Sequence, residues 1–206
     1  MNTIQSLIVR VKKTEHGFSD ILKAAEEVFA SSGSPAATLE TAKELFASEV
    51  HQARVLATFL FGKLAVHSRE SFAFLRRRVS LDQDWRVQET LAKAFDQYCK
   101  DNGYEKSLPV IKDWLGDPHP NVRRAVTEGL RIWTGRDYFR ERPGVAINLL
   151  SKLKADESEY VRKSVGNALR DISRKHRDLI AAEVAKWDRS DKRVLQTHKL
   201  ASKFLK

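Results

Sequence analysis

The feature that most constrains this 206-residue chain is a pattern that occurs twice in tandem, in residues 117–131 and 156–171. Each copy has an acidic turn followed by Val-basic-basic-x-Val-x-x-x-Leu-basic, which places Val122 and Val161 at equivalent positions. A weaker copy starts at Asp84 and has Val87 at that position. The three valines are 35 and 39 residues apart. Self-similarity at a period near forty residues is typical of stacked helical repeats.

This spacing predicts an all-α, HEAT-like solenoid of about five to six antiparallel helix pairs with a concave basic face. The second helices of the pairs are expected to line that face. A single domain is predicted over residues 1–206. Within it, residues 1–33 form N-terminal helices, 34–206 form the repeats, clearest at 82–176, and 178–206 form a C-terminal capping pair.

Hydrophobic periodicity predicts a series of helices joined by short turns. They cover residues 3–13, 20–30, 38–47, 50–66, 68–79, 84–99, 107–115, 119–134, part of 138–153, 158–176, 178–187 and 191–205. The helix over 50–66 is the most apolar and is predicted to be central. Ser19 and Ser107 are predicted to be N-caps, Phe29 and Trp133 to face inward, and Cys99 to be a buried thiol. The predicted packing anchors of the last pair are Trp187, Leu195, Leu200 and Phe204.

The chain is strongly basic, with a net charge of +10. Residues 1–49 carry a net charge of −2 and residues 50–206 carry +12. Positive charge concentrated on the repeats favours a polyanion partner, although a well-solvated basic surface is the alternative. The arginines at 76–78 either complement the end of their helix or bind phosphate.

Several classes of protein are not supported by the sequence. No apolar run is long enough to span a membrane, and a single cysteine excludes an internal disulfide framework. The six histidines form no metal-ligand pattern, and no phosphate-binding or dinucleotide-binding loop is found. We therefore expect a cytoplasmic monomer that uses no metal or cofactor.

Helix geometry predicts which side chains the second helices present outward. With about 100° of rotation per residue, the valines and leucines of each copy face the core, and a polar set faces away. The outward set is Arg124, Glu128 and Arg131 in one copy, Lys163, Asn167, Arg170, Asp171 and Arg174 in the next, and Glu89, Lys93, Asp96 and Gln97 in the weaker copy. In the two clear copies, the carboxylates of Glu128 and Asp171, each flanked by arginine, therefore lie on a basic surface. Ordinary pairing between residues three or four apart is the structural alternative.

The segments that begin at Val122 and Val161 resemble those of the DNA alkylation repair glycosylases of the AlkC/AlkD type, and more closely those of the AlkC branch. The resemblance covers roughly residues 104–180. It implies hydrolysis of the N-glycosidic bond of a cationic N3- or N7-alkylated purine in double-stranded DNA. It also implies that Asp171 is catalytic together with Glu128. The expected DNA-binding residues are Arg124, Arg131, Lys163, Asn167, Arg170, Arg174, Lys93 and Arg136.

The sequence departs from this family at two places. Arg136 stands where the AlkC pattern has a tryptophan, and Trp85 is followed by Arg86 rather than by the Trp-Asp of the AlkD type. Two alternative functions therefore remain open. One is a non-catalytic nucleic-acid-binding protein, and the other is a protein-binding scaffold, because a repeat fold does not by itself determine function.

Overall fold

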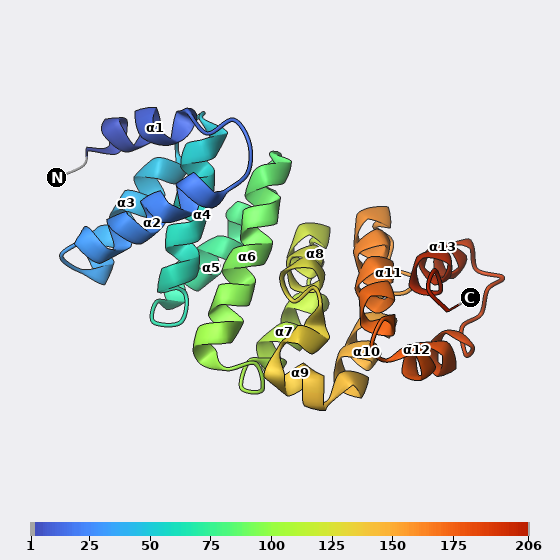
Figure 1. The fold of residues 1–206 in the computed structure, drawn as a ribbon. Helices are drawn as coiled ribbons and strands as arrows, with labels where there is room; N and C mark the ends of the chain where they lie inside the picture. Colours follow the sequence, from blue (N-terminus) through green and yellow to red (C-terminus); the bar gives the residue numbers. More distant parts are fainter. Residues whose placement is uncertain (1–2, 206) are drawn as a thin grey trace. The chain divides into compact units, whose positions relative to one another are not determined.

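The computed structural model describes residues 3–205, and every regular element within that range is a helix (Figure 1). The all-α helical-repeat prediction is confirmed. The contacts divide the chain into two compact units, Met1–Asn102 and Gly103–Lys206, which we call unit 1 and unit 2. One continuous repeat domain over 1–206 remains a prediction.

Unit 1 is organised around one buried helix, α4. The elements of this unit are α1 (Ile4–Lys12), α2 (Ser19–Ser31), α3 (Pro35–Phe46), α4 (His51–Leu64), α5 (Arg69–Arg77), a 3-10 helix η1 (Val79–Leu81) and α6 (Trp85–Asn102). Helix α4 packs against the other five α-helices of the unit (Figure 1). Ten of its fourteen residues are buried, as expected for a helix that is apolar on all sides. Its predicted central position is confirmed.

Unit 2 contains three successive helix pairs. Its elements are α7 (Leu108–Leu115), α8 (Pro120–Gly129), a 3-10 helix η2 (Trp133–Gly135), α9 (Asp137–Glu141), α10 (Pro143–Ser151), α11 (Glu159–Ser173), α12 (Arg177–Val184) and α13 (Lys192–Ala201). The pairs are α7 with α8, α10 with α11, and α12 with α13. The second helices are also neighbours, because α11 packs against both α8 and α13 (Figure 1). Gly166 permits the contact with α13, since a Cβ there would lie 2.6 Å from the Cβ of Leu200.

The repeated sequence pattern corresponds to a repeated hydrogen-bond arrangement around one arginine. Arg123 donates from Nη1 to the carbonyls of Asp117 and Pro118, at 2.7 and 2.9 Å, in the loop before its own helix. Its Nε and Nη2 donate to the carboxylate of Asp156, both at 2.7 Å, in the loop before the next second helix. A single guanidinium therefore joins two successive loops of unit 2.

The same arrangement is found in the next copy of the pattern and also on α4, outside the copies. Two further arginines each donate to two carbonyls of the preceding loop and to a side-chain oxygen farther along the chain. Arg162 donates to the carbonyls of Asp156 and Glu157 and to the side chain of Gln196. Arg54 donates to the carbonyls of Ser48 and Glu49 and to the side chain of Asp82. In the weaker copy Gln88 takes the arginine's place and donates to the carbonyls of Ser80 and Asp82.

The acidic residue of each turn has a structural role as well. The carboxylates of Asp82, Asp117 and Asp156 each accept a hydrogen bond of 2.8 Å from the backbone N–H two residues later. This side-chain bond closes the turn that precedes the helix. The acidic turn is therefore part of the repeat architecture.

One predicted helix is shorter than expected. Residues 119–134 were predicted to be helical throughout, but α8 ends at Gly129, and residues 133–135 form the separate η2. Between them Ile132 adopts a left-handed conformation with φ 45°. A left-handed residue cannot continue a right-handed helix, so the chain turns here. Trp133 is fully buried, as predicted.

Of the two predicted serine caps, Ser107 occupies the N-cap position and Ser19 does not. Ser19 is the first residue of α2, and Phe18 occupies the cap position without a side-chain hydrogen bond. Ser107 is the N-cap residue of α7, as predicted, but its side chain makes no capping hydrogen bond, because its hydroxyl donates to the carbonyl of Gly103 at 2.9 Å.

The predicted packing positions are partly wrong, by one residue for Phe29, Leu195 and Leu200. Phe29 is 39% exposed, whereas its neighbour Val28 is buried. In the last helix pair Trp187 is buried as predicted, but three expected anchors are only half-buried: Leu195, Leu200 and Phe204. The buried side chains of α13 are Val194, Thr197 and Ala201. One residue corresponds to a rotation of about 100°, which the sequence pattern did not resolve. Cys99 is fully buried, as predicted.

We predict that Arg123→Ala destabilises the protein by about 3–5 kcal/mol, because it leaves the carboxylate of Asp156 buried without its partner. That side chain is only 4% exposed. The free energy of unfolding in urea measures the loss. The control is Lys186→Ala, which removes an exposed ion pair with Glu183 and should cost less than about 1 kcal/mol. A similar loss in both variants would contradict the structural role of Arg123.

Candidate nucleic-acid interface

The positive charge of the chain is concentrated in unit 2. Residues 103–206 contain 23 Lys and Arg against 14 Asp and Glu, a net charge of +9, whereas residues 1–102 contain 14 against 13, a net charge of +1. All but one of the predicted site residues belong to unit 2. Lys93 belongs to unit 1, where its ammonium lies 5.6 Å from the ring centroid of Phe18.

Two helices of unit 2 bring both predicted catalytic carboxylates to one group of charges. Glu128 lies at the end of α8, and Asp171 lies on α11. Arg131 Nε donates to Asp171 Oδ2 at 2.9 Å, and its Nη1 lies 3.5 Å from Glu128 Oε2. Arg170 contacts the other oxygen of Asp171 at 3.1 and 3.3 Å. We call Glu128, Arg131, Arg170 and Asp171 the carboxylate–arginine cluster.

Arg131 is the most accessible member of the cluster. Its side chain is 38% exposed, whereas those of Glu128 and Asp171 are 13% and 12% exposed. Burial opposes the charged form of Arg131, but the hydrogen bond with Asp171 and the charge of Glu128 outweigh burial and raise the pKa of Arg131. The guanidinium therefore stays charged at the surface, where it can meet an anion. The carboxylates lie beneath it.

Arg136 holds the turn that presents Arg131. Its guanidinium donates to the carbonyls of Gly129, Arg131 and Ile132, at 3.0, 2.8 and 3.3 Å. These carbonyls lie at the end of α8 and in the turn after it, where no further helical N–H group can bind them. The structure thus gives Arg136 a local role, and we do not include it in the proposed DNA surface.

The predicted outward orientation of Arg124 is wrong. Its side chain is buried, with 7% exposure, and its guanidinium lies 4.3 Å from the ring centroid of Tyr160. Tyr160 belongs to α11, so the neighbouring helix covers the arginine. A buried guanidinium stacked on an aromatic ring is not available to DNA phosphates, and we remove Arg124 from the expected DNA-binding set.

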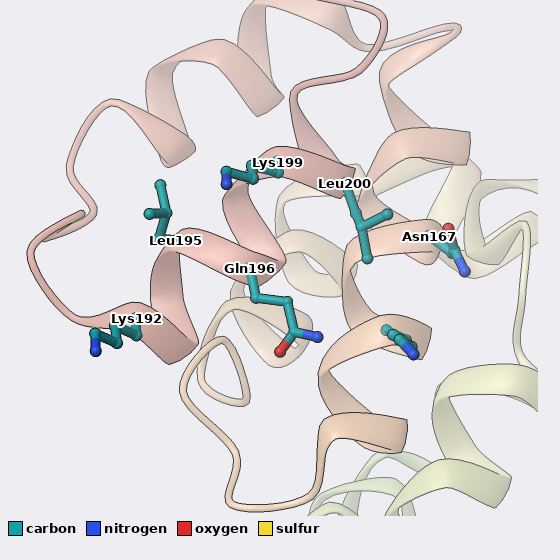
Figure 2. A pocket seen from close by; sticks show the side chains of 7 residues that line it. Asn167, Lys192, Leu195, Gln196, Lys199 and Leu200 are labelled. Atoms are coloured by element: carbon teal, nitrogen blue, oxygen red, sulfur yellow. The ribbon is translucent and has the colours of Figure 1, made fainter.

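Two predicted DNA-binding residues line a groove between α11 and α13. Lys163 and Asn167 lie on its α11 side. The residues from α13, which Figure 2 shows together with Asn167, are Lys192, Leu195, Gln196, Lys199 and Leu200. The groove has a volume of about 420 Å³. Lysines surround a largely apolar floor. Lys163 also pairs with Glu159 at 2.7 Å, with both side chains more than half exposed.

Two basic residues that line this groove were not among the predicted DNA-binding residues. Lys192 and Lys199 lie seven residues apart on α13, with Gln196 between them on the same face. Their spacing on one helix face was the available signal. Arg174, predicted to bind DNA, is exposed and lies 4.8 Å from the ring centroid of Phe204.

Residues 3–205 contain no group of three or more His, Cys, Asp or Glu side chains arranged to hold a metal ion. Within the same range, no helix combines the length and apolar character that crossing a membrane requires.

Comparison with known proteins gives a family and several solved structures. The family model described as DNA alkylation repair enzyme matches residues 18–200. AlkD2 from Streptococcus mutans is 47% identical with a TM-score of 0.95, over 98% of this chain and 97% of that one. The protein smu.31 from Streptococcus mutans UA159 is 45% identical with a TM-score of 0.92, over 99% and 100% of the two chains.

Two further relatives are more distant or cover less of the chain. The alkylpurine DNA glycosylase AlkC of Pseudomonas fluorescens, solved bound to DNA containing an abasic site analog, is 22% identical with a TM-score of 0.53. It matches 98% of this chain and 62% of that one, and the likeness concerns the fold alone. The uncharacterized protein YhaZ of Bacillus subtilis (strain 168) is 36% identical over 87 residues. That match spans 40% of this chain and only about a quarter (24%) of YhaZ.

We predict that Ile132→Gly stabilises the protein by up to about 1 kcal/mol. The left-handed conformation costs a residue with a Cβ about 1–2 kcal/mol. Glycine avoids this cost, but its greater conformational entropy in the unfolded chain lowers the stability by about 0.5–1 kcal/mol. Ile132→Ala keeps the strained backbone and is the matched control. Urea unfolding of the two variants measures the difference. An Ile132→Gly variant less stable than Ile132→Ala would show that the turn is not strained.

Proposed function

The chain belongs to the DNA alkylation repair enzyme family, and we propose that it binds double-stranded DNA and hydrolyses the N-glycosidic bond of a cationic N3- or N7-alkylated purine. The family predicted from the repeat segments is thereby confirmed. Over the whole chain, the likeness to the AlkD2 structure is greater than the likeness to AlkC. The observation that carries the proposal is the shielded carboxylate of Asp171 beneath the accessible guanidinium of Arg131.

The proposed reaction places positive charge next to a carboxylate. As the bond between C1′ and the alkylpurine breaks, its electron pair neutralises the cationic base, and the sugar becomes an oxocarbenium ion. Asp171 stabilises that charge electrostatically. A water molecule then adds its oxygen to C1′ and gives its proton to the carboxylate. Because the alkylated purine is already a good leaving group, moderate stabilisation suffices.

Arg131 is proposed to couple DNA binding to the carboxylate. In the free protein its guanidinium bonds to Asp171 at 2.9 Å and lies near Glu128. A DNA phosphate offers the same guanidinium another charge-assisted, bidentate partner. When Arg131 turns toward the phosphate, Asp171 loses one of its two arginine partners and faces the sugar. We propose that Lys163, Asn167 and Arg174 bind neighbouring phosphates.

A second candidate function is DNA binding without chemistry. It is favoured by the pairing of Asp171 with two arginines, Arg131 and Arg170. A carboxylate that two guanidinium groups neutralise stabilises a developing cation less well. Arg136 also stands where the family pattern has a tryptophan. In this second candidate function, the arginines of the cluster bind the DNA backbone, and the two carboxylates hold those arginines in place.

Single-turnover release of methylated bases from methylated DNA tests the catalytic proposal. We predict that the wild-type protein releases N3- or N7-methylpurine, and that Asp171→Asn lowers the rate at least about 10²-fold, the usual effect of removing one stabilising group. Duplex affinity should be unchanged or higher, because a negative charge is lost. Asp178→Asn, which alters an exposed carboxylate on α12, is the matched control.

The outcomes separate the candidates. Release that Asp171→Asn leaves unchanged would remove Asp171 from the catalytic role. A wild-type protein that releases no base but binds duplex would support DNA binding without chemistry.

The salt dependence of duplex affinity distinguishes a DNA-binding protein from a protein-binding scaffold. We predict that log K falls linearly with log[salt] between about 50 and 200 mM, with a slope that reports the number of neutralised phosphates. Lys163→Ala should reduce that slope by about 0.9. Lys112→Ala, which removes an exposed lysine from the first helix α7, should leave the slope unchanged. Affinity insensitive to salt would contradict both DNA-binding candidates.

A further inference from the structure

One tryptophan of the chain is exposed, in contrast to the other three. Trp85, the first residue of α6, is 59% exposed. Trp114 and Trp133 are fully buried, and Trp187 is 5% exposed. An exposed tryptophan presents a large apolar ring face to water, and such residues are enriched at binding surfaces. Nothing in the proposed reaction uses Trp85, which lies in unit 1.

A cavity of about 240 Å³ lies beside Trp85. Its walls come from the loop between α1 and α2 and from the first turns of α4 and α6. The lining side chains include Glu15, Phe18, His51, Val55, Trp85 and Arg86. The volume is below the range of about 300–1,000 Å³ that is typical of sites for drug-sized ligands, so the cavity suits one ring system. Aromatic, aliphatic and polar groups converge on this small space.

The wall formed by the loop between α1 and α2 is held in place. Gln52, on α4, donates from Nε2 to the carbonyl of Thr14 at 3.2 Å. Gly17 has φ +76°, a conformation that a residue with a Cβ rarely adopts, and it turns the chain toward Phe18. The cavity is therefore shaped before any ligand binds, which lowers the entropic cost of binding.

The polar groups of the cavity are oriented as well. Arg86 donates to both oxygens of Asp84, at 3.0 and 2.8 Å, and its guanidinium carbon lies 5.3 Å from the ring centroid of Trp85. Burial, and then the charge of Arg86, lower the pKa of His51. The imidazole is therefore neutral at neutral pH and provides one hydrogen-bond donor and one acceptor. The donor and the acceptor of His51 can bond to the edge of a nucleobase, and the aromatic ring of Trp85 can stack on its face.

We propose that this cavity binds a nucleobase from an unpaired stretch of a DNA strand, stacked on Trp85 and hydrogen-bonded by His51. Stacking on an aromatic side chain is how proteins bind single strands without strong sequence preference. Arg86, next to the ring, offers a positive charge to the strand. A base within a duplex is already stacked and paired, so only an unpaired base can enter. This site is separate from the proposed catalytic cluster and does not depend on it.

The fluorescence of Trp85 provides a direct test. Because the other tryptophans are buried, the fluorescence that changes on ligand binding should come mainly from Trp85. We expect saturable quenching by an unstructured single-stranded oligonucleotide and little quenching by a fully paired duplex of the same length. Trp85→Phe should lose the signal while retaining most of the affinity, measured by anisotropy of a labelled strand. Trp85→Ala should weaken single-strand affinity about 5- to 150-fold, the effect of losing one stacked base.

Controls make the result specific to the cavity. Leu81→Ala removes another exposed apolar side chain of unit 1, 53% exposed, and should leave single-strand affinity unchanged. His51→Ala should weaken binding while Trp85 remains able to report it. Equal affinity in the Trp85→Ala and Leu81→Ala variants would overturn the proposal. Equal quenching by the duplex, or by deoxyadenosine monophosphate alone, would overturn the assignment to an unpaired strand.

Discussion

The repeat architecture depends on one interaction, the guanidinium that joins the turn before its own helix to the turn of the next repeat. Arg123 satisfies two loop carbonyls and the buried carboxylate of Asp156 at once. Because an unpaired buried carboxylate is costly, the two loops are held in a single register. The same aspartate closes its own turn by accepting the N–H of Ser158. The acidic turn and the first basic residue of the repeated pattern are therefore two halves of one contact.

This contact divides the basic residues of unit 2 into two classes. Arg123 and Arg162 are used within the fold, and Arg124 is buried against Tyr160. The positive charge that remains for a polyanion comes from other side chains, including Lys163 and the lysines of α13 that line the groove. A net charge of +9 in unit 2 thus overstates the charge available for a polyanion. The location of each cation matters more than the total.

The carboxylate–arginine cluster depends on the early end of α8. If the helix had continued through residue 134, Arg131 would have remained on its regular surface. Instead the chain leaves the helix after Gly129, Ile132 becomes left-handed, and Arg136 binds the exposed carbonyls. Arg131 then lies against Asp171 on α11. A non-glycine residue in this conformation is often found at a functional site, and here it lies beside the cluster.

The sequence by itself determined the helical-repeat class, the family and the central position of α4, and it singled out Glu128, Arg131 and Asp171, which the fold brings into contact. These properties follow from hydrophobic periodicity and from short motifs, which are local features of the sequence. Only the tertiary structure decided that Arg124 is buried, that α8 ends early, and that Phe29 and Leu195 are displaced from the core by one residue. It also placed the exposed Trp85 beside a cavity. Such features depend on the neighbouring helix, because packing fixes the rotation of a helix more finely than its hydrophobic pattern does.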